Sequence, residues 1–153
     1  MFNEDIERAG KIYQVGIVPH YLHKSHPVVL ALAERLGPMA RVIDVFDSPR
    51  QVVTEIASCK HIFSSSLHGL VVADSIGIPN RWVLLSDDLI GGSFKFRDYY
   101  SAYGIEETSV ELTGLETLDQ LVSLCSLKPR DRIKKAKSDI NAAYLHFARC
   151  VAG

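Results

Sequence analysis

Three serines followed by Leu-His-Gly, residues 64–69, bring more chemical groups together than any other segment of this chain. Residues 61–63 before them form a short apolar run typical of a buried strand, and apolar residues after them recur at helical spacing. Serine hydroxyls cap helix N-termini, where free N–H groups and the macrodipole favour anions. The segment therefore predicts a phosphate or carboxylate site, with His68 on the first helical turn beside it.

The same segment also has a plainer interpretation. Serine-rich helix starts are common as simple caps, and a histidine near a helix start is more often a polar surface or core residue than a catalyst. The crowding of Ser, His and Gly at one strand-to-helix turn favours the functional interpretation, because ligands of open α/β sheets bind at the carboxyl ends of strands.

Strand-like and helix-like segments alternate along the first part of the chain. We expect strands over residues 12–18, 41–46, 61–64 and 81–85. We expect helices over residues 27–36, from Pro49 after the cap residues Asp47 and Ser48, and from the three serines to Gly77, with Pro79 preventing continuation. This alternation indicates parallel βαβ units, so the predicted fold class is α/β, a Rossmann-like parallel sheet flanked by helices.

The second part of the chain has a different pattern. We expect a loop over residues 86–93, an aromatic helix over 94–103 closed by Gly104, and a helix over 117–127. Apolar residues at spacings of three and four predict an amphipathic helix over 130–151, whose basic residues lie mostly on its solvated face. We expect residues 1–153 to form a single domain.

Composition narrows the possible classes of protein. The chain has 153 residues, 47% of them hydrophobic, which is enough for one domain with a core, and its formal net charge of −1 gives no polybasic surface for nucleic acid. Its three cysteines form no CxxC pair, which indicates a reducing compartment. Without a long apolar run we expect no transmembrane segment. We expect a cytoplasmic protein, either free or peripheral at the inner face of the cell membrane.

Three histidines and a lysine follow the first strand: His20, His23, Lys24 and His26. Their spacing is not the i, i+4 pair of a helical zinc site, and no Cys or Glu cluster joins them, so we expect no metal site. His20 and Lys24 are expected at the same sheet edge as His68, where they would help neutralise an anion. The alternative is that they belong to a surface loop.

Cations alternate with aromatic residues over residues 94–100. Arginine binds carboxylate or phosphate with a fork of donors, and aromatic rings stack on ligands. In the alternative interpretation Phe94, Phe96 and Tyr100 pack inside while Lys95 and Arg97 extend along the surface. The sequence leaves both interpretations open.

The sequence Ser65-Ser66-Leu67-His68-Gly69, followed by Ala73-Asp74, Gly77 and Pro79, resembles the signature of the polysaccharide pyruvyl transferase family. Residues 16–21 resemble the first strand of that family's carboxy-terminal domain. Residues 86–87 and 94–100 resemble a segment of its exopolysaccharide-biosynthesis branch. The resemblance covers about residues 12 to 104.

The resemblance implies a GT-B-type architecture, with two Rossmann-type domains and the site in the cleft between them. The chain is too short for both domains, so we expect it to be the carboxy-terminal domain only, with an amino-terminal domain missing from this chain. One departure from the family's pattern is Ser66, because many members carry an arginine immediately before Leu-His. The cation then comes from Lys95, Arg97 or the absent domain.

The resemblance further implies transfer of pyruvate from phosphoenolpyruvate, the donor substrate, to a sugar of an exopolysaccharide repeat unit as a ketal. The acceptor partner is a saccharide or a lipid-linked oligosaccharide, and no cofactor or metal is expected. His68 is the expected catalytic residue, a general acid that protonates the enol carbon. The expected donor-binding residues are Ser64, Ser65, Ser66, Leu67, Gly69, His20, Lys95 and Arg97.

Two other functions stay open at this point. A nucleotide-sugar-dependent glycosyltransferase half would place its diphosphate at the same helix terminus, because the chemistry of the terminus is phosphate recognition in general. A non-catalytic remnant that binds a ligand or a partner is the other, since half of a cleft rarely catalyses a reaction.

Overall fold

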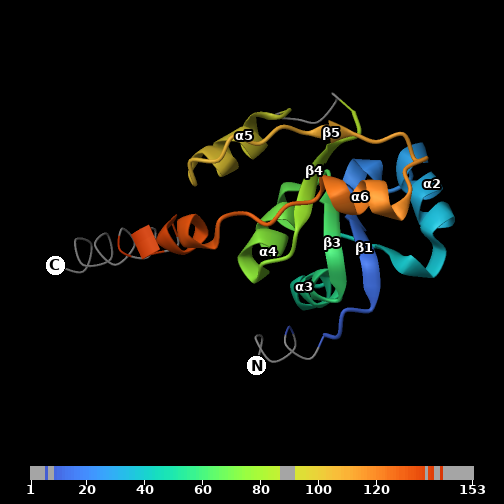
Figure 1. The fold of residues 1–153 in the computed structure, drawn as a ribbon, viewed down its shortest axis with the longest axis horizontal. Helices are drawn as coiled ribbons and strands as arrows, with labels where there is room; N and C mark the ends of the chain where they lie inside the picture. The colour runs from blue at the N-terminus through green and yellow to red at the C-terminus, as the bar shows by residue number, and fades with distance from the viewer. Residues whose placement is uncertain (1–5, 7–8, 87–91, 137, 140–141, 143–153) are drawn as a thin grey trace.

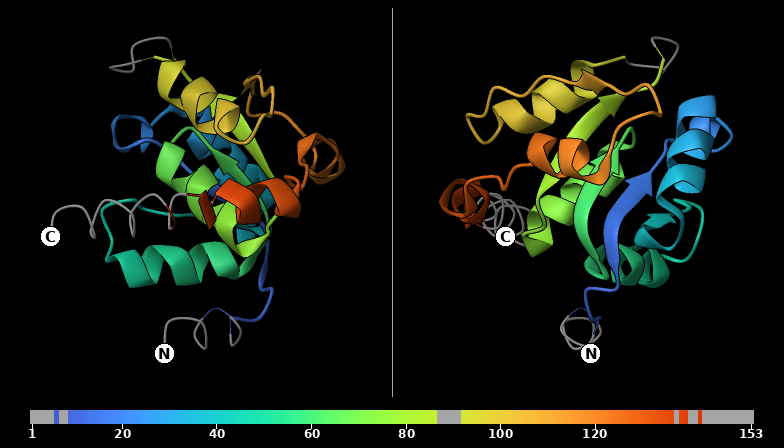
Figure 2. Two further views of the ribbon diagram at one scale, coloured as in Figure 1. Left: turned by 90° about the vertical axis from the view of Figure 1, so that its left-hand side faces the viewer. Right: turned by 45° about the vertical axis from the view of Figure 1, so that its right-hand side comes forward.

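Five parallel strands form one sheet with helices on both faces (Figures 1 and 2). The computed structural model describes residues 6, 9–86, 92–136, 138–139 and 142. The order of the strands across the sheet is β2-β1-β3-β4-β5, and each adjacent pair is parallel. They span Tyr13–Val18 (β1), Ala40–Val42 (β2), Cys59–Ser64 (β3), Asn80–Leu84 (β4) and Val110–Glu111 (β5). The predicted α/β fold class is confirmed.

Two layers of helices bury the two faces of the sheet. Helices α2 (Pro27–Leu36) and α6 (Leu118–Leu124) pack on the face that carries Phe63 and Val83. Helices α3 (Pro49–Ala57) and α4 (Leu67–Ile76) pack on the opposite face around Ile62, and α5 (Phe94–Ser101) packs beside α4 against Trp82. Two short 3-10 helices, η1 (Tyr21–His23) and η2 (Gly37–Met39), complete the named elements.

Cap chemistry sets the helix boundaries. Helix α2 has the predicted bounds, and the side chain of His26 caps it by accepting from the Val28 amide. Ser48 caps α3 before Pro49, as expected. Helix α4 ends at Gly77, which has the predicted left-handed conformation with φ of 74°. Each of these helices therefore begins or ends where a side chain or a glycine satisfies its terminal backbone groups.

The observed elements differ from the expected ones at several boundaries. The strand expected over 41–46 ends at Val42, because Asp44 accepts the Phe46 amide with its carboxylate and the Asp47 amide with its carbonyl, which turns the chain. The helices expected over 94–103 and 117–127 end at Ser101 and Leu124. Strand β5 was not predicted, since its two residues give no periodic signal.

The C-terminal helix predicted over residues 130–151 is described only in part. Residues 130–136 are helical, with Ile133 buried and Arg130, Arg132, Lys134 and Lys135 exposed, as expected for a solvated basic face. Most of residues 137–151, like residues 87–91 of the expected loop, lie outside the described residues.

A buried carboxylate fastens α5 to α4 and β4. Asp74 of α4 is 5% exposed and accepts hydrogen bonds from Asn80 Nδ2 at 2.6 Å and from the Tyr99 hydroxyl at 3.1 Å. Burial is the main influence on the pKa of Asp74 and raises it above 3.8, while the hydrogen bonds from Asn80 and Tyr99 act in the opposite direction. Asp74 thus holds the helix that carries Lys95 and Arg97.

Ion pairs fix the segment that returns from α5 to β5. Glu107, 7% exposed at its side chain, accepts from Arg81 Nη1 at 3.0 Å and from Lys128 Nζ at 2.5 Å. Because Arg81 and Lys128 share the single carboxylate of Glu107, these three residues together carry an excess positive charge next to β4.

The buried state of Asp74 predicts a pH-dependent stability. The unfolded chain releases this proton at a lower pH than the folded chain, so the free energy of unfolding falls as the pH rises from 3.8 through the raised native pKa. Asp74→Asn does not titrate. Its stability relative to the wild type should therefore increase between about pH 4 and about pH 7 in urea denaturation.

Asp131→Asn, at an exposed carboxylate of the C-terminal segment, is the matched control and should show no such trend. A stability difference between Asp74→Asn and the wild type that stays constant or shrinks with rising pH would contradict the burial effect.

Candidate functional site

The predicted site lies at the topological switch point of the sheet, where the order in which successive strands are added reverses. The chain moves from β1 outward to β2, and then crosses to β3 on the other side of β1. In open α/β sheets such a switch point leaves a crevice beyond the carboxyl ends of the two strands, and this crevice is where ligands bind. His20 follows β1, and the Ser64–His68 segment runs from the last residue of β3 into the first turn of α4, so the sequence motifs meet at this position.

Hydrogen bonds between serine hydroxyls and backbone groups join the two loops. The Ser64 hydroxyl lies 2.9 Å from the Val18 carbonyl and 2.7 Å from the Ser66 carbonyl, and it accepts the Ser66 amide at 3.1 Å. The Ser65 hydroxyl accepts the His20 amide at 2.9 Å, and the Ser65 amide donates to the Val18 carbonyl at 3.2 Å. Ser64 and Ser65 are therefore occupied in holding the site together.

The start of α4 keeps free donors. Ser66 occupies the cap position without forming a side-chain cap bond, and among the described residues its hydroxyl has no recorded partner. The amides of Leu67, His68 and Gly69 likewise have no acceptor among the described residues. These amides and the Ser66 hydroxyl lie at the positive end of the helix macrodipole, an arrangement that binds anions.

Gly69 is required by close packing and not by an unusual backbone conformation. A Cβ atom at this position would lie 2.5 Å from Ser64 Oγ and 2.8 Å from Val18 Cγ1. Real Cβ atoms do not approach so closely, so a side chain here would displace the hydroxyl that joins the loops. The glycine of the Leu-His-Gly motif lets the first turn of α4 rest directly on β1 and β3.

Three elements bring basic side chains to this crevice. His68 is exposed on the first turn of α4, His20 is half-buried after β1, and Lys95 lies on α5. The pKa of His20 is lowered, first by burial and then by the nearby charges of Lys95, His23 and His68. The structure thus places three of the expected site residues, His20, His68 and Lys95, in one electrostatic cluster.

The other residues of the first loop have structural partners. The Nε2 atom of buried His23 lies 2.9 Å from the Ser86 hydroxyl. Lys24 pairs with Asp44 at 2.5 Å and lies over the ring of Phe46. No group of three or more His, Cys, Asp or Glu side chains arranged to hold a metal ion occurs within the described residues.

Arg97 lies apart from this cluster. It donates to the Ser93 hydroxyl and lines a pocket formed with β4 and with residues 107–109. Residues two positions apart on a helix point about 200° apart, so Lys95 and Arg97 lie on different sides of α5. Phe96 and Tyr100 are buried as one interpretation expected, but Phe94, which that interpretation also placed inside, is 74% exposed.

Sequence reasoning assigned no role to several polar residues beside the crevice. Asp74 and Tyr99 hold α5, and Trp82, Ser93, Thr108 and Ser109 line the pocket beside Arg97. Two signals pointed toward this pocket: the alternation of cations and aromatic residues over residues 94–100, and the one tryptophan of the chain inside a predicted strand.

A Rossmann-like sheet with free helix-terminal amides at its switch point is typical of ligand-binding α/β domains. Comparisons with known proteins identify the family. A model of the family described as polysaccharide pyruvyl transferase matches residues 4–87, which is more than half of the chain. The chain belongs to the polysaccharide pyruvyl transferase family.

Two curated relatives also match this chain. The chain is 36% identical over 106 residues to the uncharacterized protein L143 of Acanthamoeba polyphaga mimivirus, covering 69% of this chain and 37% of that protein. It is 27% identical over 95 residues to the succinoglycan biosynthesis protein ExoV of Rhizobium meliloti (strain 1021), covering 62% of this chain and 29% of that protein. The matches thus span about a third of each relative. No solved structure gives a significant match.

None of the helices in the described ranges is both long enough and apolar enough to cross a membrane.

Replacing Gly69 tests the packing that builds this site. Gly69→Ala should lower the free energy of unfolding by about 1–3 kcal/mol in urea denaturation, because the added methyl group overpacks the contact with Ser64 and Val18. Gly10→Ala is the control, since a Cβ at Gly10 meets nothing within 4 Å. Equal stability of Gly69→Ala and Gly10→Ala would show that α4 is not held in this close contact.

Proposed function

We propose that this chain is the carboxy-terminal, donor-binding domain of an enzyme that transfers pyruvate from phosphoenolpyruvate to a sugar of an exopolysaccharide. Membership of the polysaccharide pyruvyl transferase family supports this function. The match to a protein named for succinoglycan biosynthesis supports a polysaccharide acceptor. The observation that carries the proposal is the start of α4, where the amides of Leu67, His68 and Gly69 have no acceptor within the described residues, together with the electrostatic interaction of His20 with His68 and Lys95.

The charge of phosphoenolpyruvate suits this cluster. The donor is a small polyanion with one phosphate and one carboxylate, and its two groups need fixed donors on different sides. In this proposal the phosphate lies at the amides of Leu67, His68 and Gly69 with the Ser66 hydroxyl. Lys95 and His20, which come from separate elements, face the carboxylate. Ser66 then supplies a neutral donor where an arginine stands in many family members, and Lys95 supplies the cation.

His68 is the proposed general acid. Protonation of the methylene carbon of phosphoenolpyruvate makes the adjacent carbon electrophilic, so that an acceptor hydroxyl adds to it. Loss of phosphate and addition of a second hydroxyl then close the cyclic ketal. Each hydroxyl releases its proton as it adds, so that one proton leaves with the phosphate and the other restores His68. The exposure of His68 at the crevice lets its imidazole reach a bound substrate.

The remaining parts of the reaction belong to a partner domain in this proposal. The chain matches about a third of each curated relative. In a GT-B-type transferase the facing domain would contact the reacting sugar of the acceptor. We propose that the acceptor is a saccharide or a lipid-linked oligosaccharide and that the reaction takes place in the cytoplasm, free or at the inner face of the cell membrane. Both described cysteines, Cys59 and Cys125, are free thiols, which suits a reducing compartment.

A competing function uses the same helix terminus. The diphosphate of a nucleotide sugar would also bind the α4 amides, which would make the chain half of a glycosyltransferase. Isothermal titration calorimetry of the chain with phosphoenolpyruvate, a UDP-sugar and a GDP-sugar separates the two functions. We expect measurable binding of phosphoenolpyruvate and weaker binding of both nucleotide sugars.

Lys95→Gln should weaken phosphoenolpyruvate binding by about tenfold, because it removes a charged donor. Lys60→Gln, at an exposed lysine near the opposite end of β3, is the matched control. Preferential binding of a nucleotide sugar would favour the glycosyltransferase. Binding of neither donor would favour a non-catalytic domain.

His68→Ala tests the proposed acid in an active transferase that contains this domain. We expect kcat to fall by about 10²–10⁴-fold, the usual contribution of a general acid, with a smaller effect on the Kd for phosphoenolpyruvate. Unchanged turnover in His68→Ala would remove His68 from the mechanism.

A further inference from the structure

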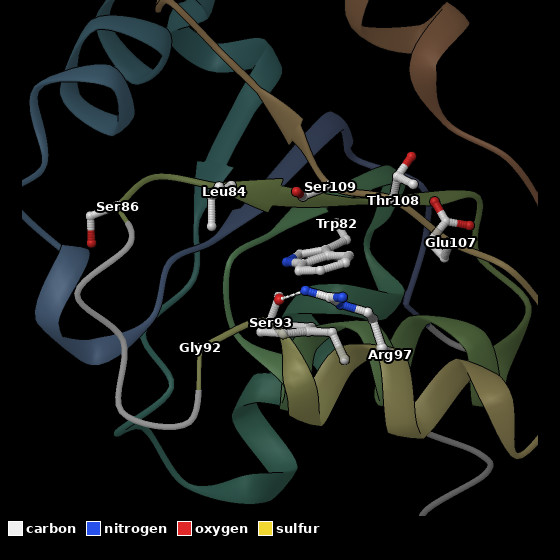
Figure 3. A pocket seen from close by; sticks show the side chains of 10 residues that line it. Trp82, Leu84, Ser86, Gly92, Ser93, Arg97, Glu107, Thr108 and Ser109 are labelled. Atoms are coloured by element: carbon white, nitrogen blue, oxygen red, sulfur yellow. Dashed lines mark hydrogen bonds between the residues drawn. The ribbon is translucent and has the colours of Figure 1, made fainter.

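A second concave site lies on the Arg97 side of α5, between that helix, β4 and the segment 107–109 that leads into β5 (Figure 3). Its volume is about 390 Å³, within the range of small-ligand pockets. It contains none of the residues of the α4 turn. Its lining combines one indole, four hydroxyls, one guanidinium, one carboxylate and apolar groups: Trp82, Leu84, Ser86, Gly92, Ser93, Phe96, Arg97, Glu107, Thr108 and Ser109.

Trp82 presents an unpaired donor to this pocket. Its side chain is 3% exposed and stacks on Phe96, with ring centroids 4.6 Å apart and planes 12° apart. No acceptor for its indole N–H is recorded in the part of the chain that the structure describes. Figure 3 shows this nitrogen at the ring edge that faces the pocket. This N–H is not among the fully enclosed unpaired atoms of the described residues, so an oxygen of a ligand in the pocket can reach it and accept its hydrogen bond.

The charges around the pocket favour an anion. Arg97 is exposed and donates to Ser93, and it has no acidic partner within the described ranges. The carboxylate of Glu107 is shared by Arg81 and Lys128. The charge of Glu107 is therefore compensated by Arg81 and Lys128, and the guanidinium of Arg97 remains available for a carboxylate or phosphate.

The other lining groups match a hydroxylated ring. Ser93, Thr108 and Ser109 offer hydroxyl groups that both donate and accept, while Leu84 offers apolar contact. A pyranose has hydroxyls around its edge and C–H groups on its faces. An aromatic base fits less well, because the buried faces of Trp82 leave only its edge for a ligand.

We propose that this pocket binds an anionic saccharide unit, a pyranose that carries a carboxylate or a phosphate. The acid group pairs with Arg97, and a ring oxygen accepts from the indole N–H of Trp82. The proposal goes beyond the donor site and rests on the proposed function only in that the saccharide would be part of the polysaccharide acceptor. The site would hold an acidic unit of that chain beside the reaction centre.

Ligand-observed NMR on the full chain, with glucuronate, glucose 1-phosphate and glucose as probes, tests this proposal. We expect at least one of the two anionic sugars to bind about tenfold more tightly than glucose, and the preference between them distinguishes a uronic acid from a sugar phosphate. Arg97→Gln should lower the affinity of the chain for the preferred probe by about tenfold. Arg35→Gln, at an exposed arginine of α2, should leave that affinity unchanged.

Trp82→Phe removes the indole donor and keeps an aromatic ring against Phe96. It should therefore lower the affinity for the same probe by about three- to tenfold. Should Trp82→Phe fail to fold, Arg97→Gln still decides the question, because Arg97 is exposed. Glucose binding as tight as that of both anionic sugars, or no binding of any probe, would overturn the proposal.

Two further outcomes separate this site from the donor site. If Arg97→Gln weakened phosphoenolpyruvate binding and left the anionic sugar unaffected, Arg97 would be a donor ligand and the proposal would be wrong. If His68→Ala abolished binding of the anionic sugar, that sugar would lie at the α4 turn, which would also overturn it. If phosphoenolpyruvate failed to bind, the proposed donor site would be wrong, but the sugar titrations would still decide whether the Arg97 pocket binds an anionic saccharide.

Discussion

The organisation of the site depends on one set of contacts, the hydrogen bonds that serine hydroxyls make between the loops after β1 and β3. The Ser64 hydroxyl lies 2.9 Å from the Val18 carbonyl and accepts the Ser66 amide, while Ser65 accepts the His20 amide. These bonds hold the two carboxyl ends together at the switch point and fix where α4 begins. They leave the amides at its start free for an anion, and they explain why position 69 cannot carry a side chain.

Helix α5 divides the surface beside this turn into two sites. The buried carboxylate of Asp74 holds α5 against α4 and β4, so that Lys95 joins the histidines of the crevice while Arg97 lines the pocket beside Trp82. Glu107 and its two cations then fix the segment that closes the pocket. The position of α5 therefore decides which cation each site receives, Lys95 in the crevice and Arg97 in the pocket.

The sequence predicts the parts of this domain that depend on local chemistry. The α2 bounds, the caps at Ser48 and Gly77, and the parallel sheet follow from cap residues and from alternating apolar segments. The roles of Ser64 and Gly69 could not be predicted, because they depend on contact with Val18, which is distant in sequence. Strand β5 has two residues, and a pattern that short carries no periodicity. The sequence also could not show that Lys95 and Arg97 belong to two different sites, because this depends on where α5 packs against the rest of the domain.

The central claim is that His20, His68 and Lys95 surround a phosphoenolpyruvate site, and the pKa of His20 tests it most directly. That pKa is lowered by burial and by the neighbouring charges of Lys95, His23 and His68. A bound polyanion would offset those charges and stabilise the protonated imidazole. Histidine side-chain NMR titrations should therefore show the pKa of His20 rising when phosphoenolpyruvate saturates the chain. An unchanged or lower pKa would contradict the account.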